Sequence, residues 1–224
     1  MTTLDVIYED DAFLVINKPC GLLSIQDGYQ LNLPHIRSLI EPQYGRCWII
    51  HRLDKETSGV MVLARNTESH RYFNLCFQNR KIEKIYHALI FGIPEQKEFN
   101  IDLPLLINGD KKHRTVTQLL SGKKALTIIR VISSKNNISF VYAYPKTGYT
   151  HQIRAHLSSS GFPILGDRLY RNQTKTNLNS SENQIPRLAL HAHSIAFFHP
   201  VTNKLQIYIA NYPDDFSSLI NQFT

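Results

Sequence analysis

A carboxylate and a guanidinium lie two residues apart in the segment His51-Arg52-Leu53-Asp54, which runs into Thr57-Ser58-Gly59. If the apolar strand pattern that begins at Trp48 continues to Asp54, residue alternation puts Arg52 and Asp54 on one face. An ionised aspartate in this place could act as a nucleophile or as a general base. Taken alone, these residues are more typical of a surface ion pair beside a turn.

Two further segments carry side chains that suit the same chemistry. Residues 84–88 alternate so that Lys84 and Tyr86 share a strand face, and a tyrosine in a cleft can stack on a nucleobase with a gain of ~1–3 kcal/mol. Arg154, in an expected helix over 151–160, could hold a carboxylate by a bidentate pair and keep it ionised. Taken singly, Tyr86 is more typical of a half-buried core position, and Arg154 of a solvated helix face.

The charge balance favours a polyanionic partner. The chain of 224 residues has 25 Lys+Arg against 18 Asp+Glu, a formal net charge of +7. Such an excess suits RNA, DNA or an anionic membrane surface, although many basic proteins bind no nucleic acid. Lys111, Lys112, His113 and Arg114 form a local basic cluster, which is either a contact for a nucleic-acid backbone or a solvated loop.

The sequence predicts neither a membrane protein nor a secreted one. No apolar run approaches the roughly 20 residues that a membrane-spanning helix needs. The first residues are acidic and lead directly into a strand pattern, so we expect no signal or transit peptide. Cys20, Cys47 and Cys76 form no CxxC pair, which favours reduced thiols. These features predict a cytoplasmic protein without membrane association.

The apolar pattern predicts many strands and few helices. A hairpin is expected at 6–8 and 13–16, and a helix is expected to begin with Asn66 or Thr67 as its cap. The helix over 151–160 should end at Gly161. The other strands are expected at 48–50, 60–64, 84–91, 115–119, 126–133, 138–144, 188–198 and 205–209, with a polar surface loop at 171–186. This pattern indicates an α+β fold around a mainly antiparallel sheet, in a single domain over 1–224 that is either compact or divided into two lobes.

Taken together, five segments resemble successive signatures of the RluA-type pseudouridine synthases. They are NKPCGL at 17–22, HRLDKETSG at 51–59, KIYHA at 84–88, TGYTHQIRAHLSSSGFPILGDRLY at 147–170 and RLALHAHSIAFFHP at 187–200. They occur in the family's order, and HRLD followed by THQIR and GD..Y is a highly specific combination. The resemblance implies a mixed, mainly antiparallel sheet with flanking helices and a central RNA-binding cleft. It also implies an isomerase that converts uridine to pseudouridine in structured RNA (tRNA or rRNA), without a cofactor or a metal.

The resemblance also assigns roles to single residues. Asp54 matches the catalytic aspartate, Tyr86 the tyrosine that packs against the target base, and Arg154 the basic residue paired with the aspartate. Arg52 matches an arginine that helps to fill the gap left by a flipped nucleotide. Further RNA contacts are expected from His51, Thr57, Lys84, Lys111, Lys112, Arg114, Tyr149, His151 and Gln152. The chain departs from the family at Tyr149, where arginine is usual, so a charged phosphate contact is lost there.

Two other functions stay open on the residues alone. A metal-dependent hydrolase would need His151 with His156, or His191 with His193, although neither spacing is typical of a helical metal site. A non-catalytic RNA-binding protein of the same fold would not need the trio of Asp54, Tyr86 and Arg154. The resemblance is to members without an appended N-terminal RNA-binding domain, and we expect a monomer with no obligatory protein partner.

Overall fold

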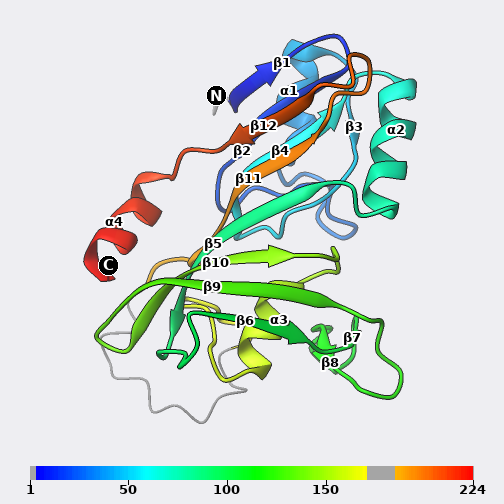
Figure 1. Ribbon diagram of the computed structural model, residues 1–224. Helices are drawn as coiled ribbons and strands as arrows, with labels where there is room; N and C mark the ends of the chain where they lie inside the picture. Colours follow the sequence, from blue (N-terminus) through cyan, green and yellow to red (C-terminus); the bar gives the residue numbers. More distant parts are fainter. Residues whose placement is uncertain (1–3, 171–184, 224) are drawn as a thin grey trace. The chain divides into compact units, whose positions relative to one another are not determined.

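The computed structural model describes residues 4–170 and 185–223, and the chain forms two compact units (Figure 1). Unit 1 comprises residues 1–84 and 191–213, and unit 2 comprises residues 85–190 and 214–224. Most of the surface loop expected at 171–186 therefore lies outside the described residues. The expectation of a single domain over 1–224 stays a prediction. No helix in the described parts is long and apolar enough to cross a membrane.

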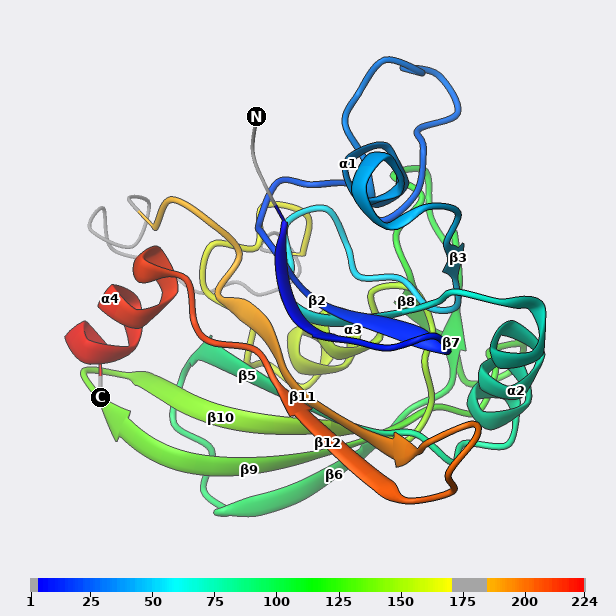
Figure 2. The same cartoon turned by 90° about the horizontal axis from the view of Figure 1, so that it is seen from above.

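Unit 1 is built from antiparallel strands and one parallel pair. Its elements are β1 (Asp5–Glu9), β2 (Phe13–Lys18), α1 (Ile36–Tyr44), β3 (Trp48–Ile49), β4 (Ser58–Ala64), α2 (Thr67–Gln78), β11 (Leu190–Phe198) and β12 (Leu205–Ile209). The strands follow the order β1-β2-β4-β11, and β3 also pairs with β4. Strands β4 and β11 are parallel neighbours, whereas β12 runs antiparallel beside β11 (Figure 2).

The core of unit 1 explains why these segments fold as they do. Phe13 from β2, Phe73 from α2 and Phe197 from β11 are almost fully buried and meet edge to face, with ring centroids 5.0–5.6 Å apart. The expected hairpin is confirmed as β1 and β2. The expected cap is confirmed too, because the Asn66 side chain accepts a hydrogen bond from the Ser69 N–H (2.8 Å) at the start of α2.

Gly59 allows β4 and β11 to approach closely. Its φ of +118° lies in a region that residues with a Cβ rarely adopt, and a Cβ at this position would collide with the backbone of Ala192. The neighbouring Ser58 Oγ lies 2.9 Å from Nδ1 of the buried His191, so a side-chain hydrogen bond accompanies the backbone pairing. The glycine of the Thr57-Ser58-Gly59 segment therefore has a packing role in unit 1.

Gly59→Ala should lower the free energy of unfolding by about 3 kcal/mol or more, because it adds overpacking to backbone strain. Gly21→Ala is the matched control. Gly21 also has a positive φ (+85°), but nothing lies within 4 Å of its Cβ position. The control should therefore lose only about 1–2 kcal/mol from strain. Urea denaturation of both variants measures the difference, and equal losses would show that the contact with Ala192 does not matter.

Unit 2 holds a second set of antiparallel strands. Its elements are β5 (Glu83–Phe91), β6 (Glu98–Asp102), β7 (Leu105–Leu106), β8 (Val116–Thr117), β9 (Leu126–Lys135), β10 (Ile138–Pro145), α3 (Gln152–Ser159) and α4 (Asp214–Phe223). The strands follow the order β5-β10-β9-β6, and β7 pairs with β8. Helix α3 packs on β8, β9 and β10, while α4 packs on β10 (Figure 1). The expected α+β class with a mixed, mainly antiparallel sheet is confirmed.

The strand expected at 48–50 is present as β3, but it ends at Ile49 and does not continue to Asp54. The Val62 N–H of β4 donates instead to Nε2 of His51 (3.0 Å), so a side chain takes the place of further strand pairing. Arg52 and Asp54 therefore do not lie on one face of a continuous strand. The strand expected at 115–119 is reduced to Val116–Thr117, since the Gly122 N–H turns back to the carbonyl of Gln118 (3.0 Å).

Candidate active site

The loop that carries Asp54 is anchored by a buried lysine. The side chain of Lys18, at the end of β2, is fully buried, and its ammonium donates to the carbonyls of Pro19 (2.9 Å), Leu22 (2.8 Å) and Lys55 (3.1 Å). These contacts use all three donors of an ammonium group. The Gly21 N–H adds a bond to the Lys55 carbonyl (2.8 Å). Residues 17–22 thus fix the backbone next to Asp54.

Two more contacts set the position of Asp54 itself. Ser24 Oγ donates to the Leu53 carbonyl (2.7 Å) and accepts from the Leu53 N–H (3.1 Å), which holds the preceding residue from both sides. The Thr57 N–H then closes a turn on the Asp54 carbonyl (3.1 Å). Asp54 is half-buried at the start of this turn. A carboxylate held on so fixed a backbone is suited to act as a base or as a nucleophile.

His51 has a structural function in unit 1. Its Nε2 accepts the Val62 N–H, and its ring lies against Phe77 with centroids 5.0 Å apart. Burial of the imidazole, together with the nearby Lys84 ammonium, lowers the pKa of His51 to about 3. The imidazole is therefore neutral near pH 7 and contributes no positive charge.

Lys84 belongs to the same environment as His51. Its Nζ lies 6.0 Å from the centre of the Phe77 ring, and burial lowers the pKa of its ammonium to about 8. Desolvation disfavours the charged form, so this lysine loses its proton at a lower pH than an exposed one. The charge of Lys84 can therefore change within the physiological pH range.

Two other residues near Asp54 differ in exposure. Arg52 is exposed to solvent, as a residue that contacts a ligand should be. Thr57 is buried, and its hydroxyl has no hydrogen-bond partner among the described residues. Buried polar groups normally have partners. The expected ligand contact of Thr57 stays a prediction.

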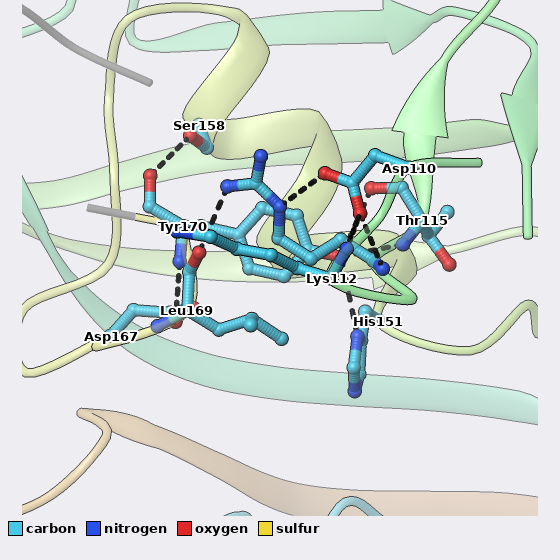
Figure 3. A network of polar contacts seen from close by, with 9 residues as sticks. Asp110, Lys112, Thr115, His151, Ser158, Asp167, Leu169 and Tyr170 are labelled. Atoms are coloured by element: carbon cyan, nitrogen blue, oxygen red, sulfur yellow. Dashed lines mark hydrogen bonds and ion pairs between the residues drawn. The ribbon is translucent and has the colours of Figure 1, made fainter. Parts of the chain in front are cut away.

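In unit 2, Arg154 is fixed by an acid that sequence reasoning did not single out. Its Nε and one terminal nitrogen donate to the two carboxylate oxygens of Asp167 at 2.7 and 2.8 Å (Figure 3 shows Asp167 in place). The side chains are 7% and 1% exposed, so this is a buried bidentate ion pair. The alternative of a solvated charge on the helix is wrong for Arg154. The expected pairing of Arg154 with Asp54 stays a prediction.

The other expected residues of unit 2 occupy distinct positions. Tyr86 is half-buried on β5 and lies opposite Ala143 of β10. Tyr149 is also half-buried and packs against the apolar cluster around Tyr170. Gln152 is 4% exposed, and its amide bonds Thr147, Tyr149, Leu126 and Thr127. Gln152 therefore organises the start of α3, while a contact with a ligand stays a prediction.

The basic cluster at 111–114 lies in a loop whose backbone is ordered by Asp110. One Asp110 oxygen accepts the N–H groups of Lys112 and Arg114 (3.0 Å each), and the other accepts the Arg114 guanidinium (2.6 Å). Arg114 also donates to the Leu169 carbonyl (3.0 Å). Lys111 and Lys112 are exposed to solvent, and Figure 3 shows Lys112 beside Asp110. We call residues 110–115 the basic loop.

One histidine of each pair that a metal-dependent hydrolase would need is bonded within the protein through both ring nitrogens. His156 bonds Thr127 Oγ1 and the Leu103 carbonyl, both at 2.9 Å. His191 bonds Ser58 Oγ (2.9 Å) and the Ala210 carbonyl (3.2 Å). In residues 4–170 and 185–223, no three acidic, histidine or cysteine side chains gather into a cluster that could hold a metal ion. Because both ring nitrogens of His156 and of His191 are engaged, neither pair can offer a metal ion one ring nitrogen from each of its two histidines without losing one of these bonds.

Known proteins match nearly the whole chain. A protein family described as RNA pseudouridylate synthase matches residues 12–159. The dual-specificity RNA pseudouridine synthase RluA of Pasteurella multocida is 37% identical, over 90% of this chain and 90% of that protein. The protein of the same name from Haemophilus influenzae is 33% identical, over 92% of each.

Solved structures agree with this match. The structure of human RNA pseudouridylate synthase domain containing 1 has a TM-score of 0.79 at 25% identity, covering 99% of this chain and 88% of that chain. Human RNA pseudouridylate synthase domain containing 4 also has a TM-score of 0.79, at 26% identity, covering 97% of this chain and 92% of that chain. The residues matched by the family, 12–159, include Asp54, Tyr86 and Arg154.

Proposed function

The chain belongs to the RNA pseudouridylate synthase family, and from this premise we propose that Asp54, Tyr86 and Arg154 carry the conversion of uridine to pseudouridine within RNA. As a member of the family the chain is an isomerase. Its reaction breaks the N1–C1′ bond of uridine, turns the uracil and joins it again through C5. The observation that carries the proposal is the family match over 12–159, a range that includes all three residues.

Each residue has a distinct role in the proposal. Asp54 is the catalytic carboxylate, and it must be ionised whether it attacks C1′, attacks uracil C6 or removes a ribose proton to form a glycal. Arg154 favours that ionised form through its positive charge. Tyr86 packs against the target base. The fixed backbone around Asp54 and the buried pair of Arg154 with Asp167 support these roles, because both groups are held in place before RNA binds.

RNA recognition is proposed to rest on exposed basic groups. A uridine in a helix or a folded loop must leave its stack at a cost of a few kcal/mol, and Arg52 is exposed where it could fill the gap. Lys111 and Lys112 are proposed to bind the phosphate backbone. Other expected RNA contacts have mainly structural surroundings, and we propose that they shape the site: His51, Thr57, Tyr149, His151 and Gln152. The RNA-binding cleft itself stays a prediction.

Tritium release tests the proposal and the substrate class together. The relatives named above are described as dual-specificity RNA pseudouridine synthases, and we propose that this chain acts on tRNA or rRNA. Unmodified transcripts of both RNAs, labelled with tritium at uridine C5, are incubated with the protein without any added cofactor and with a chelator. Release from one pool or from both is expected. If neither releases tritium although the folded protein binds them, the non-catalytic RNA-binding function becomes the better account.

The charge state of Lys84 should make RNA binding depend on pH. Because burial lowers the pKa of Lys84 to about 8, the ammonium loses its charge as the pH rises from 7.0 to 8.5. We therefore expect RNA affinity to fall severalfold over this range at low salt. Lys84→Arg is the matched control, since a guanidinium stays charged throughout and should remove most of the dependence. A parent protein whose affinity does not change between these pH values would show that Lys84 does not contact the RNA.

We also propose that the protein acts as a cytoplasmic monomer without an obligatory protein partner. The three free cysteines agree with a reducing compartment, because Cys47 and Cys76 are buried and Cys20 is half-buried. Light scattering at catalytic concentrations tests the oligomeric state, and a mass of twice the monomer would overturn this part of the proposal.

A further inference from the structure

Tyr170 lies at the centre of a polar network in unit 2. Its ring is 1% exposed, and its hydroxyl contacts both the N–H and the carbonyl of Thr115 at 3.0 Å. The same hydroxyl lies 3.2 Å from Nδ1 of His151 (Figure 3). A phenol has one donor and two acceptor positions. All three contacts are satisfied when the hydroxyl donates to the Thr115 carbonyl and accepts from the Thr115 N–H and from a protonated Nδ1 of His151.

The ring and the backbone of Tyr170 reach the other side of the network. The Tyr170 N–H and the Leu169 N–H donate to the Asp167 oxygen that also accepts from Arg154 (3.1 and 3.0 Å). The guanidinium carbons of Arg154 and Arg114 lie 5.2 and 5.8 Å from the Tyr170 ring centre. One side chain therefore contacts the arginine of the proposed catalytic group and both final residues of the basic loop.

Backbone strain marks the same place. His151, the N-cap residue immediately before α3, has a φ of +55°, and His113 in the basic loop also has a φ of +55°. A residue other than glycine keeps such a conformation only where its surroundings determine it. Thr115 Oγ1 adds a bond to the Thr150 carbonyl (2.7 Å), next to His151. The end of the basic loop and the start of α3 are thus held in one fixed arrangement.

We propose that Tyr170 is a positioning residue that couples the RNA grip of the basic loop to Arg154, the arginine of the proposed catalytic group. Through its hydroxyl it holds Thr115, and with it the direction in which Lys111 and Lys112 face the RNA. Through its ring and its N–H it holds Arg154 on Asp167. The inference rests on the proposed function, because it takes RNA as the ligand of the basic loop. It gives Tyr170 a positioning role in addition to its packing in the core.

Tyr170→Phe separates these two tasks, because it removes the hydroxyl and keeps the ring. The Thr115 amide should exchange its hydrogen faster, and the KM for a tRNA transcript should rise about 10-fold while kcat changes less than about 2-fold. Tyr170→Leu also removes the ring from Arg154, so kcat should fall as well. A variant that only loses stability would not divide its effects between KM and kcat in this way.

The salt dependence of RNA binding gives the sharpest test. The logarithm of the binding constant falls as the logarithm of the salt concentration rises, and each lost phosphate contact makes this slope shallower by roughly 0.7–0.9. Tyr170→Phe should make the slope shallower by as much as the double variant Lys111→Ala, Lys112→Ala does. The triple variant, which combines all three substitutions, should bind RNA no more weakly than the double variant. Arg114→Met removes the hydrogen bond that anchors the loop at the Leu169 carbonyl, so it should also make the slope shallower.

Additive effects in the triple variant, or an unchanged slope in Tyr170→Phe, would overturn the inference. These binding measurements do not require turnover. A protein that shows the expected slopes but makes no pseudouridine would contradict the proposed function and leave the coupling intact. If the parent protein is active but Tyr170→Phe keeps the parent's slope, the coupling is contradicted and the proposed function is left intact.

Discussion

Asp54→Asn should remove nearly all pseudouridine formation while the protein folds and binds RNA normally. The amide has nearly the shape of the carboxylate, so the contacts of Ser24 and Thr57 with the backbone of Leu53 and Asp54 are kept. The amide can neither attack carbon nor accept a proton at neutral pH. We expect turnover to fall about 10³-fold, within the range for a positioned acid or base, and further for a nucleophile. Single-turnover tritium release measures the change.

Glu56→Gln is the matched control for this variant. Glu56 is an exposed carboxylate two residues further along the same loop, and the substitution makes the same chemical change. The control should keep the parent's rate. An equal loss in both variants would mean that the net charge of the loop matters rather than Asp54. Full activity in Asp54→Asn would remove Asp54 from the mechanism.

Arg154→Met should lower the free energy of unfolding more than any other substitution proposed here that removes one charged side chain. The substitution leaves Asp167 as a buried carboxylate without its guanidinium, although the N–H groups of Leu169 and Tyr170 still bond it. Removing one partner of a buried pair costs about 3–5 kcal/mol. Arg130→Met is the matched control, because Arg130 and Glu98 form a similar pair (2.9 Å) with both side chains more than half exposed.

Urea denaturation of the two variants decides the point. Arg130→Met should differ little from the parent, since exposed ion pairs are screened by water and salt. A comparable loss in both variants would contradict the assignment of Arg154 to a buried structural pair. Arg154→Lys adds a second check, because an ammonium keeps the charge and cannot form the bidentate contact. It should recover only part of the stability.

The sequence predicts the fold class and most elements because the apolar periods are clear. The hairpin, the cap at Asn66 and the helix that ends before Gly161 are confirmed. Helix α4 was missed, although Asp214 and Asp215 in its first turn and the buried Phe216 and Leu219 are ordinary helix signals. The short strands β6 and β7 and helix α1 were missed as well. Such short segments are decided by tertiary contacts more than by local periodicity.

The residues that hold the site could not be found from local patterns. Lys18 stands in the segment NKPCGL, where no local pattern indicates its contacts, and only the folded chain shows that its ammonium binds three carbonyls. Asp167 lies 13 residues after Arg154, across the end of a helix, so neither strand nor helix spacing predicts their pairing. The motif GD..Y at 166–170 was the available signal. His51 was expected to contact RNA, whereas in the structure its ring accepts the Val62 N–H of β4 where the strand pairing of β3 has ended.

The most direct measurement is a count of pseudouridine in RNA after incubation with the protein. A tRNA transcript labelled with tritium at uridine C5 is incubated, and the tritium released is measured in one portion. The rest is digested to nucleosides, which are separated and counted. We predict one pseudouridine for each tritium released by the parent protein, and none with Asp54→Asn. Bound RNA without pseudouridine, or tritium release without it, would contradict the assignment of this chain as an RNA pseudouridine synthase.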